Sequence, residues 1–134
     1  MIDTMLPLIT HPHAVMTGKA LLTSFFWLAG LFGLFNFKTI VQEMVDVGLP
    51  RPRLFALATI ACQLLGSALL ISNVAGLAWL GAGALAVFTL LCIPIGHPFW
   101  KFSEPKRSAE FHIALEHIAV VGGLFLAAAI SQLY

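Results

Sequence analysis

Long uncharged apolar runs alternate with short polar segments along this chain. Residues 20–37 carry no charge, residues 54–100 contain no Asp, Glu, Lys or Arg, and residues 118–134 are again uncharged. A helix needs about 20 apolar residues to cross a bilayer, so the middle run is long enough for two helices and each of the others for one. The pattern therefore predicts an all-α membrane protein, folded as a four-transmembrane-helix bundle.

Polar and helix-breaking residues set the limits of these spans. The middle run should break near Ser72 and Asn73, and Pro94 and Pro98 should end the third span. Ser108 is a suitable N-cap for the last span. The spans are predicted at 19–37, 54–71, 75–95 and 108–133, so residues 19–134 form the transmembrane domain and residues 1–18 an external or interfacial segment.

A shorter segment between the first two spans has a different pattern. Ile40, Val41, Met44 and Val45 share one helical stripe, and the charged residues between positions 38 and 47 lie elsewhere. This arrangement predicts a short amphipathic interfacial helix at the membrane surface. A solvated extension of the first span is the alternative.

Composition and charge support the membrane assignment. Hydrophobic residues make up 60% of the chain and charged residues 10%, more apolar than a soluble chain of this length can bury. The formal net charge of +1 gives no indication of a nucleic-acid partner, so the lipid bilayer is the expected partner. Cys62 and Cys92 lie in apolar runs without zinc-type spacing, which favours core-filling thiols; no metal site is predicted.

Basic residues predict the orientation. Every basic residue except Lys19 falls in one of two segments, between spans one and two or between spans three and four: Lys38, Arg51, Arg53, Lys101, Lys106 and Arg107. The positive-inside rule places these segments in the cytoplasm and both termini outside.

The last span carries the residues best suited to chemistry. Ionisable groups within a bilayer are costly and usually face the bundle interior or water. His112 and Glu116 are four residues apart and can pair on the face of Gly123, which is expected to face the bundle. Glu110 and His117 point to nearly the opposite face, where a second helix, a partner chain or lipid headgroups should meet them.

Other polar residues should lie at the same depth. The candidates for a polar layer in the cytoplasmic half are Asn36, Gln63, His97, His112, Glu116 and His117. Such a layer can hydrogen-bond a quinone headgroup or pass protons. Haem ligation is less expected, because only His97 and His112 roughly qualify. A buried polar network that only fixes helix register is the alternative without a ligand.

Three stretches resemble the DoxX family of small four-helix bacterial inner-membrane proteins. They are the sequence GLFNFKTIVQEMVDVGLPRPRLFALATIACQLLGSALLI, the sequence GHPFW at residues 96–100, and ALEHIAVVGGLFLAA in the last span. The resemblance extends from about Lys19 to the C-terminus. Gln63 stands where many members have Glu, and Glu116-His117 where many have Lys-Asn.

The resemblance implies a bacterial inner-membrane protein linked to redox chemistry, because the family's name comes from a subunit associated with thiosulfate:quinone oxidoreduction and a terminal oxidase. The first hypothesis is a non-catalytic subunit or scaffold of a redox or oxidative-stress assembly, with membrane redox proteins or further copies of the chain as partners, and no enzyme on its own. The second is a small quinone-binding oxidoreductase component. The third, an oligomeric transporter or proton pathway, is disfavoured by the apolar external half of the spans.

Overall fold

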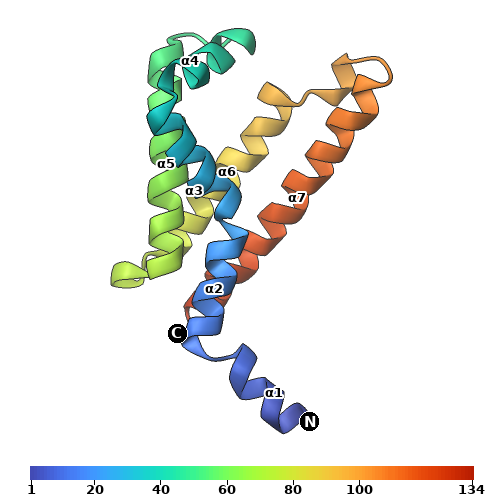
Figure 1. Ribbon diagram of the computed structural model, residues 1–134. Helices are drawn as coiled ribbons and strands as arrows, with labels where there is room; N and C mark the ends of the chain where they lie inside the picture. Colours follow the sequence, from blue (N-terminus) through green and yellow to red (C-terminus); the bar gives the residue numbers. More distant parts are fainter.

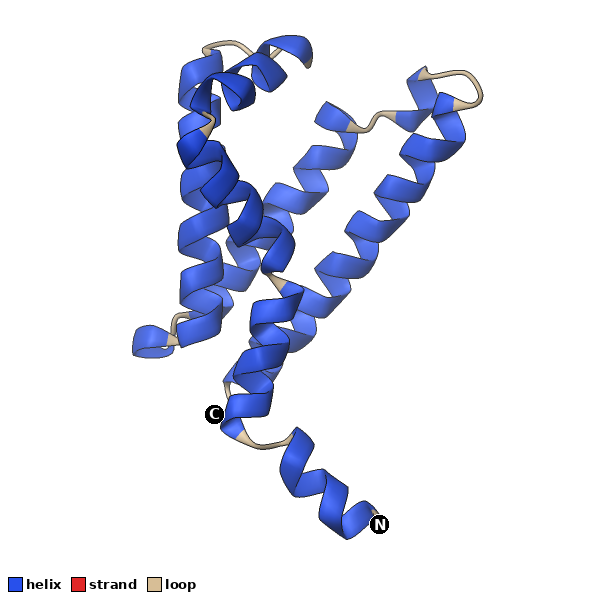
Figure 2. Cartoon of the chain, in the orientation of Figure 1, coloured by secondary structure: helices blue, strands red, loops and turns tan.

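The protein is entirely helical in the computed structural model, which describes residues 1–134 (Figures 1 and 2). The helices in chain order are α1 (Ile2–Ile9), α2 (Pro12–Leu22), α3 (Ser24–Phe35), α4 (Phe37–Asp46), α5 (Pro52–Ser72), η1 (Val74–Gly76), α6 (Ala78–Gly96), η2 (Phe99–Lys101) and α7 (Lys106–Ser131). Short loops join them. The predicted all-α class is confirmed.

Three segments are long and apolar enough to cross a membrane. They are Pro52–Ser72, Ala78–Lys101 and Lys106–Ser131, with mean hydropathies of 2.2, 2.0 and 2.1. The pair α2 and α3 also passes when the two helices are taken together, so the number of candidate spans is three, or four if this bent pair forms one span. The predicted spans 54–71, 75–95 and 108–133 lie within a few residues of α5, α6 and α7. Two of the predicted boundary residues are wrong: Pro94 lies inside α6, which continues to Gly96, and Pro105, not Ser108, is the N-cap of α7.

The first predicted span, 19–37, corresponds to no single helix. The chain bends by 56° between α2 and α3, at Thr23. Side chains at the bend donate to carbonyl groups in the last turn of α2: Thr23 Oγ1 donates to Lys19 O at 2.7 Å, Ser24 Oγ to Leu21 O at 2.7 Å, and Trp27 Nε1 to Ala20 O at 3.0 Å. This local satisfaction lets a broken helix remain in an apolar environment.

The amphipathic helix predicted between the first two spans is present as α4. It follows α3 directly after Asn36, and it packs on α5 through its apolar stripe. Ile40 is buried against Ala56 and Ile60, and Val41 and Met44 pack beside them. The charged and amide side chains of α4 remain exposed.

Helices α5 and α6 approach one another closely. Gly66 and Gly81 face one another so closely that a β-carbon added at Gly81 would lie 2.5 Å from the Gly66 carbonyl oxygen. The main apolar core lies beside this contact and is formed by Phe26, Leu70, Ala78, Ala82, Leu85, Leu124 and Ala127. Small residues also allow α3 to approach α5, where β-carbons added at Gly30 and Gly33 would lie 2.7 Å from Leu64 and 2.8 Å from Ile60.

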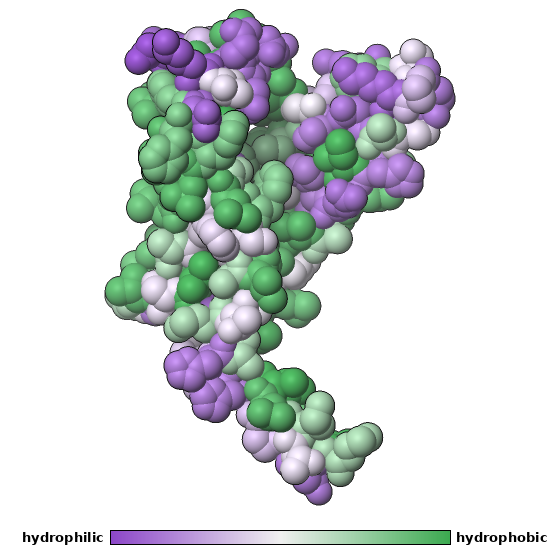
Figure 3. All heavy atoms as spheres, in the orientation of Figure 1, coloured by the Kyte–Doolittle hydropathy of each residue, from purple (hydrophilic) through white to green (hydrophobic).

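Helices α5 and α7 diverge from this core toward the opposite end, so the molecule has two arms (Figure 1). One arm consists of α3, α4 and α5, and the other of α6, η2 and α7. The arm tips carry the basic residues Lys38, Arg51, Arg53, Lys101, Lys106 and Arg107, and this is called the basic end. Figure 3 shows hydrophilic atoms over both tips and a hollow between the arms.

At the opposite end of the bundle, Asn73 forms hydrogen bonds that join three helix ends. It ends α5 in the left-handed conformation, with φ of 50°, and its side-chain amide donates to Ser131 O at 2.9 Å and to Tyr134 O at 3.3 Å. Its Oδ1 accepts a hydrogen bond from Ala78 N at 3.1 Å. One side chain thus joins α5, α6 and the C-terminal end of α7 at what is called the Asn73 end.

Candidate functional site

A cleft lies between the two arms, toward the basic end. It consists of two adjoining hollows of about 290 Å³ and 260 Å³. Both are lined by Gln63 of α5 and by Phe88, Cys92 and His97 at or near the C-terminal half of α6. The first hollow extends toward α4, and the second extends toward α3 and α7.

Gln63 brings an unpaired amide into this cleft. The residue is only 7% exposed, lines both hollows, and its side chain makes no hydrogen bond within the protein. Its neighbours include Phe88 and Phe26, so the surroundings are largely apolar. Its amide atoms are not enclosed by protein but open to the hollows, so a ligand or water there can bond to them without displacing an internal partner.

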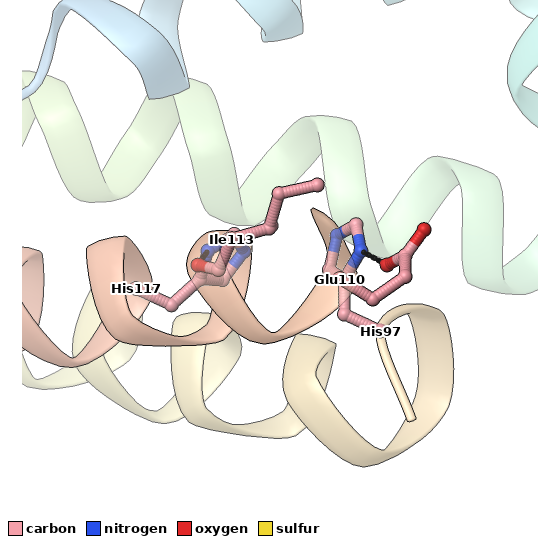
Figure 4. A network of polar contacts seen from close by, with 4 residues as sticks. All are labelled: His97, Glu110, Ile113 and His117. Atoms are coloured by element: carbon pink, nitrogen blue, oxygen red, sulfur yellow. Dashed lines mark hydrogen bonds and ion pairs between the residues drawn. The ribbon is translucent and has the colours of Figure 1, made fainter. Parts of the chain in front are cut away.

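His97 and His117 meet at the α7 side of the cleft (Figure 4). His97 Nδ1 lies 2.6 Å from Glu110 Oε2, and His117 Nδ1 lies 2.8 Å from the Ile113 carbonyl oxygen. The two imidazole rings are 5.1 Å apart between centroids, in an edge-to-face arrangement. Glu110 and Ile113 therefore fix the orientation of both rings.

These contacts define what each ring offers to a ligand. A carbonyl oxygen only accepts hydrogen bonds, so the Nδ1 atom of His117 carries the proton and donates it. The same holds for His97 Nδ1 beside an ionised Glu110. In the neutral form of each ring, Nε2 is then a free acceptor, and in the cationic form it is a donor.

Glu116 opens into the hollow that lies toward α3 and α7. Its helical face continues to Gly123, where α2 covers it: a β-carbon added at Gly123 would lie 2.9 Å from Leu22 Cδ1. Beyond the bend at Thr23 the first arm departs from α7, so Glu116 is exposed. Gln63 and Glu116 share this hollow, so the two side chains lie near one another.

The predicted pairing on α7 is wrong in one respect. His112 is exposed, lines neither hollow, and forms no hydrogen bond with Glu116. Glu110 and His117, on the other face, are the residues that meet a second helix, because that face packs on α6 beside His97. His97 is thus paired with Glu110 and stacked on His117, which leaves no basis for joint ligation of haem by His97 and His112.

Asn36 also lies outside the cleft. It is exposed between α3 and α4, and its side-chain amide donates to Phe32 O, one turn earlier, at 3.0 Å. The sequence-based layer therefore reduces to Gln63, His97, Glu116 and His117.

Sequence reasoning missed several residues that complete the cleft wall, namely Phe25, Phe26, Phe88, Thr89 and Cys92. Thr89 is buried and donates to Leu85 O at 2.7 Å. The spacing of Thr89, Cys92 and His97 along one helix could have indicated that they lie on a common face. The three Phe residues gave no such indication, because their sequence context is that of ordinary core residues.

The remaining candidates offer less chemistry. His11 and His13 are exposed and stacked, and His11 Nδ1 accepts from His13 N at 3.2 Å as the N-cap of α2. Cys62 and Cys92 are free thiols on the adjacent helices α5 and α6. No group of three or more His, Cys, Asp or Glu side chains has an arrangement suited to a metal ion.

Comparison with known proteins identifies a family. A family model described as DoxX matches residues 14–98. No protein with curated annotation and no solved structure gave a significant match. The matched region ends at Pro98, so it includes Gln63 and His97 and stops before α7. With the apolar helices, the match shows an integral membrane protein.

Proposed function

We propose that this chain, which belongs to the DoxX family, binds a small amphipathic ring compound of the quinone class in the cleft between its arms. The observation that carries the proposal is the unpaired Gln63 amide, which is 7% exposed and lines both hollows. A quinone needs hydrogen-bond donors near its carbonyl oxygens and an apolar slot for its ring, and the cleft wall offers both.

The polar groups suit both redox states of such a ring. The Gln63 amide is a donor for a carbonyl oxygen, and its own oxygen is an acceptor for a hydroxyl. The free Nε2 atoms of His97 and His117 accept from a hydroxyl when neutral and donate to a carbonyl when protonated. Binding either state therefore requires no rearrangement of the heavy atoms.

The apolar part of the wall suits the rest of the molecule. Phe25, Phe26 and Phe88 line the hollow that also holds Glu116. Aromatic side chains favour offset or edge contacts with another ring. Hollows of about 260 Å³ and 290 Å³ fit a one- or two-ring headgroup, with an alkyl tail lying in the lipid beside the cleft.

The test is a titration of the purified protein in nanodiscs with a benzoquinone that bears a short alkyl tail, followed by quenching of tryptophan fluorescence. Gln63→Leu is expected to weaken binding about tenfold, the loss of one well-placed hydrogen bond. Gln132→Leu, a matched change at an exposed position, should leave the affinity unchanged. Equal affinities for wild type and Gln63→Leu would count against the proposal.

A specific observation favours a second candidate, a non-catalytic subunit or scaffold of a membrane redox or oxidative-stress assembly. His112 and Glu116 are exposed on α7 where the first arm has departed. Ionisable groups at such positions usually meet protein or water. Co-purification in mild detergent tests this role: His112→Ala should release a partner and leave quinone binding intact, whereas a chain that always isolates alone would oppose the scaffold role.

The membrane arrangement that accompanies both roles is four crossings of a bacterial inner membrane, with α2 and α3 together as one bent span. The basic end then lies in the cytoplasm, both termini lie outside, and α4 lies at the cytoplasmic surface. No comparable observation supports a transport role. A transport path would have to pass the apolar core that includes Phe26, Leu85 and Leu124, which lies between the cleft and the Asn73 end.

A further inference from the structure

Lys19 is the one basic residue that lies away from the basic end, and its side chain is buried. It belongs to α2, is 8% exposed, and its Nζ lies 3.2 Å from Ser131 Oγ on α7. The Ser131 hydroxyl donates its own proton to Ala127 O at 2.8 Å, so it acts toward Lys19 as an acceptor.

The protein does not neutralise this ammonium group. Ser131 supplies one neutral acceptor for a group that has three N–H donors. The only ion pair within the chain joins His97 to Glu110, so no carboxylate lies within pairing distance of Lys19. A buried charge without a counter-charge is costly, which makes a bound anion the natural complement.

The space beside Lys19 has the form of a lipid site. Lys19 lines a hollow of about 300 Å³ whose other lining residues are uncharged and almost all apolar: Ile9, Val15, Gly18, Leu22, Gly123, Leu126, Ala127 and Ile130. Ser131 is the last residue of α7, so the ammonium lies at the level where a span ends and lipid phosphates lie. From Ser131 to Gly123 the groove descends about 12 Å along α7, at 1.5 Å per residue.

We propose that Lys19 and this groove bind one acidic phospholipid of the leaflet at the Asn73 end. The lipid phosphate pairs with the Lys19 ammonium, and an acyl chain lies along Leu22, Gly123 and Leu126. A zwitterionic phospholipid is a poorer ligand, because its own ammonium competes for the phosphate charge. A free phosphate ion is poorer too, because it cannot use the apolar groove. This inference is independent of the function proposed for the cleft.

Native mass spectrometry of the intact chain, released from nanodiscs of phosphatidylglycerol and phosphatidylcholine in equal amounts, tests the proposal. Wild type is expected to retain one phosphatidylglycerol in preference to phosphatidylcholine. Lys19→Met, which keeps the length of the side chain without its charge, should lower this retention about tenfold, and Lys19→Arg should preserve it. Lys101→Met, a matched change at an exposed lysine, should have no effect.

Three results would overturn the proposal. The first is equal retention of the two phospholipids by wild type, a comparison that needs no variant to fold. The second is unchanged retention in Lys19→Met. The third is displacement of the lipid by inorganic phosphate or by a free fatty acid at equal concentration, which would assign the ammonium to another anion. Normal quinone titrations in Lys19→Met would show that the cleft is unaffected in any of these cases.

Discussion

His97 Nδ1 and Glu110 Oε2 lie 2.6 Å apart and join the end of α6 to the second turn of α7. The side chains are only 29% and 17% exposed, so water screens the pair less than it screens a surface pair. The contact holds the second arm together at the basic end, where the two arms are separate, and it sets the direction of the His97 ring toward the cleft.

Removal of the Glu110 carboxylate should therefore cost stability. Glu110→Ala is expected to lower the free energy of unfolding by about 1 kcal/mol, the range of a partly buried charged hydrogen bond. Chemical unfolding in mild detergent measures the change, and a double-mutant cycle with His97→Ala should give a coupling of similar size. Glu43→Ala, at an exposed position of α4 whose carboxylate forms no hydrogen bond or ion pair within the protein, is the control. Zero coupling would show that the pair contributes nothing.

A methyl group should be tolerated very differently at two glycines of α6. At Gly81 it would lie 2.5 Å from Gly66 O and 2.9 Å from Leu70 N, both backbone atoms that cannot move without separating α5 from α6. Gly81→Ala should destabilise by about 1–3 kcal/mol. At Gly83 nothing lies within 4 Å of the added carbon, so Gly83→Ala should stabilise by up to about 1 kcal/mol. Thermal unfolding of both variants tests this difference. Equal changes in melting temperature for Gly81→Ala and Gly83→Ala would refute the close contact between Gly81 and Gly66.

Asn73 should be more sensitive to substitution than Asn36. Asn73→Ala removes three side-chain hydrogen bonds and places alanine in the left-handed region, for a loss of about 2 kcal/mol. Asn73→Gly removes the same bonds without the backbone strain, so it should cost less. Asn36→Ala, which loses one bond within its own helix, should change the free energy of unfolding by no more than about 0.5 kcal/mol. A larger loss of unfolding free energy in Asn36→Ala would contradict the conclusion that the Asn36 hydrogen bond is only local.

Cysteine labelling should determine the number of crossings. In a background with Cys62 and Cys92 replaced by alanine, Thr4→Cys and Gln132→Cys should react with a membrane-impermeant thiol reagent from one side, and Lys38→Cys from the other. Reaction of Thr4→Cys from the same side as Lys38→Cys would mean that α2 and α3 do not cross, which leaves three spans.

The last three spans could be predicted because long uncharged runs end at residues whose chemistry stops a helix. Asn73 is such a residue, and its left-handed backbone is where α5 ends. The bend at Thr23 could not be predicted in this way. Thr23, Ser24 and Trp27 look like ordinary members of an apolar run, and the sequence does not show that their side chains bond to carbonyl groups of the preceding turns at a bend.

The sequence indicates how far along their helices the polar residues lie, but not which face of α7 packs against α6. Gln63 and Glu116 share a hollow because both helices begin at the basic end and the residues lie similar distances along them. Which face of α7 meets α6 depends on the path of residues 102–105, which periodicity does not encode. For that reason Glu110, and not His112, became a partner of a second-helix residue.

The separation of the two arms also determines how a ligand reaches the cleft. The hollow between them is open on the side of the molecule, which lipid would cover in a bilayer, as well as between the two hydrophilic tips (Figure 3). A long-tailed ligand would diffuse in laterally, so its mole fraction in the membrane governs occupancy, and its concentration in water does not. Titrations at different lipid-to-protein ratios should therefore coincide only when the ligand is plotted per mole of lipid.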